Sequence, residues 1–120
     1  MREIIRDKGR LEHILEAISN VFEFTKNVVF EDLKNDKLLF FAVVKNIEII
    51  GEASYKLSKE LKTSNSNIEW DAIIGLRHVL VHDYYHISEE RVWKIIQKDL
   101  LPLKEQIQIL YDNENLLDMT

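Results

Sequence analysis

Cysteine is absent from this chain of 120 residues, and proline occurs only once and glycine three times. Without cysteine the chain can form neither a disulfide framework nor a thiolate metal site, and its composition suits a reducing compartment. So few helix-breaking residues favour long helices over a many-stranded sheet. The glycines are also too few for the glycine-rich loops that bind nucleotide phosphates.

Long apolar runs are missing as well. No stretch approaches the roughly 18 uninterrupted apolar residues of a membrane span, and the first residues lack the apolar core of a signal peptide. We therefore expect a soluble, cytoplasmic protein with no membrane partner. The length favours a single domain over residues 1–120.

The formal net charge is −5, so an excess of basic side chains is also lacking. A general nucleic-acid coat needs a basic surface, and DNA is therefore not an expected partner. The charge remains compatible with a basic partner protein. It is equally compatible with a small cleft that contacts RNA at only a few phosphates.

Apolar residues recur at intervals of three and four positions in four segments, which is the spacing of amphipathic helices. They predict helices over about residues 11–28, 37–61, 70–82 and 89–110, with residues 1–9 as a short lead. Residues 29–37 are expected to connect two helices with about one helical turn, and residues 62–69 to form a loop. The predicted fold class is all-α, a four-helix up-and-down bundle.

Three single residues refine this prediction. Ser88 is expected to cap the fourth helix, with acidic residues in its first turn. Pro102 predicts a kink or a short break near residues 100–102, because proline removes a helical hydrogen bond. The polar tail from Asp112 is expected to fray.

The second predicted helix carries two apolar stripes, so it is expected to be covered on more than one side. That makes it either the central helix of the bundle or part of a dimer face. Gly51 interrupts its apolar run at a cost in helix propensity, which indicates a close approach of another backbone.

Arg77 is the anomaly of the third predicted helix. At about 100° per residue it falls in the middle of an apolar arc, although its guanidinium stays protonated. Either a carboxylate pairs with it, and Glu52 is a candidate, or its head emerges into a cleft that binds an anion. His78 and His82 lie four residues apart and so share a neighbouring face.

Two chemistries are compatible with these residues. His78, His82 and His86 offer nitrogen ligands for a metal, but the zinc motif with this spacing places a glutamate directly after the first histidine, where Val79 stands. The favoured alternative is phosphoryl transfer on RNA without a metal or another cofactor.

In that reaction the 2′-OH of RNA is the nucleophile. His82 suits the movement of its proton, and Arg77 suits the charge of the transition state. The two residues stand five apart, roughly 140° around the helix. One copy of the pair would make a poor site, and a symmetric dimer would gather two arginines and two histidines around one groove.

The pattern Arg77-x-x-x-x-His82-x-Tyr84 resembles the signature of the HEPN superfamily, and more narrowly the HepT-like toxins of MntA/HepT-type toxin–antitoxin systems. The segments Ile50-Gly51-Glu52-Ala53, Val92-Trp93 and Leu101-Pro102-Leu103 strengthen the resemblance, which spans about residues 11–110. One departure is His78, because asparagine often follows the arginine in these relatives.

This resemblance implies a homodimeric, metal-independent endoribonuclease with catalytic Arg77 and His82 at the dimer cleft, and with His78 and Asp83 in support. It also implies a nucleotidyltransferase antitoxin that transfers AMP to Tyr84 and so blocks the cleft. A packed loop aromatic is the other interpretation of Tyr84. The sequence leaves open which RNA is cut and whether dimers associate further.

A different class of function is also open. The acidic net charge is compatible with a non-catalytic helical module that docks to a nucleotidyltransferase and helps it to hold its substrate. Loss of toxicity in a His82→Ala variant would discriminate against this alternative.

Overall fold

Every regular element in the part of the chain that the structure describes is helical. The computed structural model describes residues 4–82 and 88–118, with side chains for residues 6–77 and 88–117. The elements are α1 (Ile4–Phe24), α2 (Phe30–Asn35), α3 (Lys37–Lys56), α4 (Lys59–Ser64), α5 (Trp70–His82), α6 (Glu89–Lys94), the π-helical segment η1 (Ile95–Asp99) and α7 (Leu100–Asp118). The predicted all-α class is confirmed.

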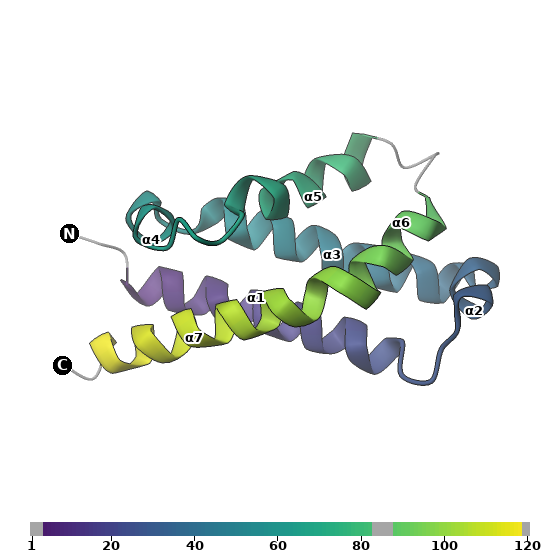
Figure 1. Ribbon diagram of the computed structural model, residues 1–120, viewed down its shortest axis with the longest axis horizontal. Coiled ribbons are helices and arrows are strands. Elements are labelled where there is room, and N and C mark those ends of the chain that lie inside the picture. Colours follow the sequence, from purple (N-terminus) through teal and green to yellow (C-terminus); the bar gives the residue numbers. More distant parts are fainter. Residues whose placement is uncertain (1–3, 83–87, 119–120) are drawn as a thin grey trace.

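The long helices alternate in direction, as expected for an up-and-down bundle. Figure 1 shows α1, α3, α5 and the continuous rod α6–η1–α7 running back and forth, with α4 at one end and α2 at the other. α1 packs against α3 and α7, whereas α5 packs chiefly against α3. No described helix is both long and apolar enough to cross a membrane.

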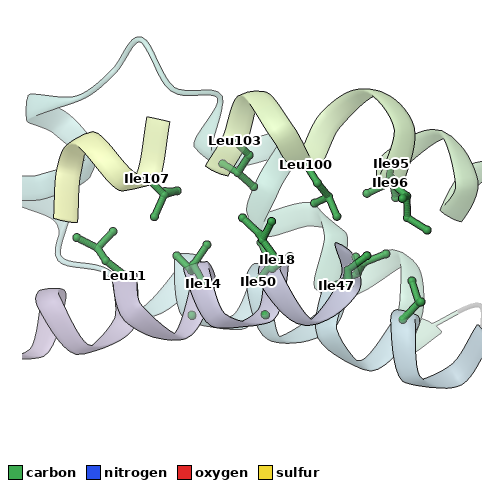
Figure 2. Packing of buried hydrophobic residues seen from close by; sticks show 14 of the residues in the cluster. Leu11, Ile14, Ile18, Ile47, Ile50, Ile95, Ile96, Leu100, Leu103 and Ile107 are labelled. Atoms are coloured by element: carbon green, nitrogen blue, oxygen red, sulfur yellow. The ribbon is translucent and has the colours of Figure 1, made fainter. Parts of the chain in front are cut away.

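The core lies where α1, α3 and the rod meet. In Figure 2 the apolar side chains of α1 point toward those of α7. The fully buried residues of this core include Leu11, Ile14, Ile18, Ile47, Ile50, Leu100 and Ile107. Burying one such side chain contributes roughly 1.5–3 kcal/mol, so these stripes hold the helices together, as their spacing predicted.

The first helix begins earlier than the sequence suggested. The expectation of a short lead over residues 1–9 is wrong for residues 4–9, which belong to α1. The carboxylate of Asp7 is fully buried and accepts hydrogen bonds from the backbone N–H (2.8 Å) and the Oγ (2.7 Å) of Ser58. This contact anchors the first turns of α1 and offsets the low helix propensity of Gly9. At its other end α1 stops at Phe24, and Asn27 takes a left-handed conformation with φ 61°.

The helix predicted over residues 37–61 is broken in two. α3 ends at Lys56, and Ser58 caps the separate helix α4, its Oγ accepting from the N–H of Leu61. The same hydroxyl donates to Asp7, so the break is fixed by a residue far away in the sequence. Part of the expected loop over residues 62–69 is therefore helical, as far as Ser64.

The irregularity expected near Pro102 takes the form of η1, which lies just before that residue. The Leu100 N–H donates to the Ile95 carbonyl, five residues back. A spacing of four residues separates Val92, Ile96 and Leu100. On an α-helix each such step would rotate the side chain by about 40° away from the core-facing side. A π-turn holds more residues, so it keeps these side chains on the core side. The predicted Ser88 cap is confirmed, since its Oγ accepts from the Arg91 N–H at 3.2 Å.

The tail does not fray as predicted. α7 continues to Asp118, and Glu114 is buried. The Tyr111 hydroxyl donates to Oε1 of Glu12 at 2.6 Å, which ties this part of α7 to α1. That hydrogen bond raises the pKa of Tyr111 above its ordinary value.

Candidate functional site

Gly51 sets the distance between α3 and α5. A Cβ built at this glycine would lie 2.7 Å from the backbone nitrogen of Arg77 and 3.1 Å from the Arg77 Cβ. Real Cβ atoms do not come so close to a backbone atom, so no larger residue fits without moving a helix. The predicted close backbone approach at Gly51 is confirmed, and its partner is the residue that the sequence marked as anomalous.

Arg77 faces α3, where its side chain contacts Glu52 and Tyr55, which lie one helical turn apart. Its Nη1 lies 3.5 Å from Oε2 of Glu52, so the candidate pair is present as a long ion pair. Its Cζ lies 3.7 Å from the ring centroid of Tyr55, which places the guanidinium over the face of the ring. The arginine side chain is 18% exposed, so it is largely buried but still reached by solvent.

The hydrogen bonding of this guanidinium is incomplete. The Nε of Arg77 is buried and has no hydrogen-bond partner among the residues that the structure describes. Glu52 is 46% exposed, and a long ion pair to a half-exposed carboxylate contributes little in water. The structure thus shows the pairing with Glu52, the first of the two environments that the sequence left open, although this pair is long and the described residues leave the buried Nε without a partner.

A second cation stands close by. Lys62, on α4, donates from Nζ to the backbone carbonyls of Tyr55 (3.0 Å) and Ser54 (3.4 Å) at the end of α3. Its Nζ also lies 5.9 Å from the centroid of the Tyr55 ring. Burial lowers the pKa of Lys62, and the charge of Arg77 lowers it further, against the opposing effect of Asp7 and Asp71. Positive charge is thus concentrated around one aromatic ring in an otherwise acidic protein.

The other predicted site residues have side chains outside the part of the chain that the structure describes. His78 and His82 belong to the last turns of α5, but their side chains are outside the described set. Asp83, Tyr84 and His86 lie outside the described residues altogether. Among the side chains that are described, no three His, Asp or Glu gather as a metal site would require.

A groove of about 840 Å³ lies on the other side of α5, between this helix and the rod α6–η1–α7. Ile73 and Leu76 of α5 line it, together with Ile95, Leu100 and Leu103 of the rod. Arg77 is not part of its lining. α5 thus presents its cation to α3 and part of its apolar arc to the groove.

Tyr55 and Lys62 were missed by the sequence analysis. Tyr55 could have been found, because it follows Glu52 by three residues and so lies on the same face of a helix. Lys62 could be placed only by recognising the break before α4. The signal was present in Ser58 followed by Glu60, a capping residue and an acidic residue in the first turn.

The chain belongs to the HepT-like ribonuclease family, because the family model described as "Ribonuclease HepT-like" matches residues 14–110. Among its relatives, "Probable ribonuclease HepT" of Thermococcus cleftensis is 37% identical over 103 residues, which cover 86% of this chain and 94% of the relative.

Two further relatives carry provisional RNase names. One protein of Methanocaldococcus jannaschii is 35% identical over 103 residues (86% of this chain, 94% of the relative). That of Caldanaerobacter subterraneus subsp. tengcongensis is 36% identical over 104 residues (87% of this chain, 93% of the relative). No solved structure shows a significant match.

Family membership confirms the resemblance found in the sequence and the assignment to the ribonucleases, a class of enzymes that act on RNA. The matched range includes Gly51, Glu52, Tyr55 and Arg77. The cluster around Arg77 is therefore part of the ribonuclease domain.

Proposed function

We propose that this protein is a toxin that cleaves RNA internally without a metal ion, with Arg77 and His82 as its catalytic residues. Arg77 binds the phosphate at the cleavage point and stabilises the charge of the transition state. His82 removes the proton of the neighbouring 2′-OH, which then attacks the phosphorus atom. The P–O5′ bond breaks and the leaving 5′ oxygen takes up a proton, which gives a 2′,3′-cyclic phosphate and a 5′-OH end. The observation that supports this most is an arginine on α5 whose only ion pair to a described residue is the long one to Glu52, and whose Nε has no partner among those residues.

The proposed active site lies between two copies of the chain. Arg77 and His82 stand five residues apart in the sequence, roughly 140° around an ideal helix, so one copy of the pair would make a poor site alone. α5 packs chiefly on α3, and at the edge where the two helices meet beside Arg77 the side chains of Tyr55 and Glu52 stay about half exposed, which leaves that edge open to a partner protomer. The expected assembly is a homodimer.

The proposed control is covalent. A nucleotidyltransferase antitoxin transfers AMP to the hydroxyl of Tyr84, two residues after His82, with pyrophosphate leaving if ATP is the donor. The added phosphate is negative and bulky, so it repels RNA and obstructs the cleft. His78 and Asp83 have supporting roles beside the catalytic pair.

A cleavage assay tests the catalytic proposal. Purified protein is incubated with RNA in EDTA, and Arg77→Ala and His82→Ala are compared with wild type. His13→Ala is the matched control, because His13 is an exposed histidine on α1. We expect wild type and His13→Ala to cut and the other two variants to lose at least a hundredfold in rate. Equal cleavage by His82→Ala would refute the role of that residue.

Growth of a bacterial host on induction separates the toxin from the alternative of a non-catalytic module that docks to a nucleotidyltransferase. The acidic net charge of −5 favours that alternative. Growth arrest with fragmented RNA in wild type, and in neither catalytic variant, would exclude it. Binding to the nucleotidyltransferase without RNA cleavage under any condition would establish it instead.

A further inference from the structure

The ring of Tyr55 lies against the head of Arg77. The Cζ of Arg77 is 3.7 Å from the ring centroid, which is the distance of two flat groups in van der Waals contact. The ring is 52% exposed, so it is not a core residue that Arg77 happens to touch. It lies at the surface, at the end of α3, where the guanidinium covers part of it.

The polar contacts of Arg77 do not fix the plane of its guanidinium. Nη1 has one long ion pair to Glu52, and Nε has no described hydrogen-bond partner. A single contact of 3.5 Å lets the group rotate about its own axis. The Tyr55 ring, with Cζ 3.7 Å from its centroid, restricts how far the guanidinium can tilt, so Tyr55 supplies part of the orientation that the described polar contacts do not.

Stacking has a second consequence for chemistry. The N–H donors of a guanidinium lie in its plane, whereas the contact with Tyr55 is made by its face. A carboxylate that held Arg77 equally firmly would occupy those donors and neutralise the charge. An aromatic ring holds the group and leaves both the donors and the charge for an anion.

We propose that Tyr55 is a positioning residue for Arg77, which aims the guanidinium edge at the phosphate of the RNA substrate. This inference rests on the proposed role of Arg77 in cleavage. It attributes part of the activity to a side chain on α3, which the motif on α5 does not include.

The test uses three variants of the full-length protein. Tyr55→Leu removes the ring, Tyr55→Phe keeps the ring without the hydroxyl, and Phe41→Leu is the control. Phe41 is an aromatic residue on the same helix with similar exposure, 56% against 52% for Tyr55. Because both positions are largely exposed, all three variants are expected to fold, and thermal unfolding verifies this.

Two measurements are made on each variant. The first is the NMR resonance of the Arg77 side chain, which ring current shifts when the guanidinium lies over an aromatic face. The second is the rate of RNA cleavage in EDTA, separated into kcat and KM. We expect Tyr55→Leu to lose the shift and about 10- to 100-fold in kcat with little change in KM, since misplacement of a catalytic group by about 1 Å has such effects. Tyr55→Phe restores both, and Phe41→Leu leaves both unchanged.

Different results would overturn the positioning role of Tyr55 and the proposed ribonuclease function. Cleavage by Tyr55→Leu at the wild-type rate, while Arg77→Ala is inactive, would overturn the positioning role alone. A resonance that is the same in Tyr55→Leu and wild type would also overturn it. Wild-type protein that leaves RNA intact would overturn the proposed function together with the role of Tyr55, even if the resonance shifts as expected.

Discussion

Replacing Gly51 with alanine would place a methyl group against the backbone of α5. The new Cβ would stand 2.7 Å from the Arg77 nitrogen, which no side-chain rotation can relieve because a backbone atom is the obstacle. α3 and α5 would have to separate by roughly 0.7 Å to reach ordinary contact distance. The change moves the helix that carries Arg77 away from Glu52 and Tyr55.

The size of the effect follows from two opposing contributions. Overpacking of this kind destabilises by about 1–3 kcal/mol, whereas alanine stabilises a helix interior over glycine by roughly 1 kcal/mol. We expect a net loss of up to about 2 kcal/mol in the free energy of unfolding, or a Tm lower by up to roughly 8 °C for a domain of this size. Because Arg77 is displaced, RNA cleavage should fall by more than this loss of stability explains.

Gly9→Ala is the matched control, since it makes the same change inside α1. A Cβ at Gly9 would meet nothing within 4 Å, so only the gain in helix propensity remains. We expect Gly9→Ala to be more stable than wild type by about 0.5–1 kcal/mol in urea unfolding followed by circular dichroism. The reasoning would be refuted if Gly51→Ala were as stable as Gly9→Ala and cut RNA at the wild-type rate.

Three further predictions concern the packing and charges around the site. Leu100→Ala should lower the free energy of unfolding by about 2–5 kcal/mol and Leu101→Ala by under 1 kcal/mol, because Leu100 is 0% exposed and Leu101 is 55% exposed. Equal losses in urea unfolding would show that the π-turn does not determine which of the two side chains faces the core. Asp7→Ala should lower the free energy of unfolding by roughly 2–4 kcal/mol, because it leaves the N–H and the hydroxyl of Ser58 without this acceptor. Glu105→Ala is the control, since Glu105 is exposed. A loss for Asp7→Ala no larger than for this control would contradict the anchoring role of Asp7. Arg77→Gln should raise the pKa of Lys62 by removing a nearby positive charge, but not to its ordinary value of 10.5, since burial is the larger cause of its lowering; an unchanged pKa in an NMR titration would mean that the two cations do not interact.

Local patterns in the sequence were sufficient for most helices and for one contact of the site. The apolar spacing placed the cores of the long helices, because each must bury one stripe. The anomalous Arg77, the unfavourable Gly51 and the acidic Glu52 predicted an encounter of α3 with α5, which the structure contains.

What the sequence analysis missed depended on distant partners. The early start of α1 and the break before α4 meet in one contact, the bond between Asp7 and Ser58, and no local periodicity reports a contact between such distant residues. Lys62 depends on that break for its place near Arg77, and only the capping signal of Ser58 and Glu60 could have placed it there. At the position of the π-turn, the sequence predicted only a kink or break near Pro102. The spacing of Val92, Ile96 and Leu100 by four residues indicates a π-turn only when all three are known to face the core.

The bond between Asp7 and Ser58 also orders events during synthesis of the chain. The two residues are 51 positions apart, and at 5–20 residues per second a ribosome needs about 3–10 s to add the second after the first. During this interval the carboxylate of Asp7 stays hydrated, and burial of that end of α1 has to wait. The buried carboxylate of Asp7 therefore gains these two hydrogen bonds only after the chain has been synthesised through the junction of α3 and α4.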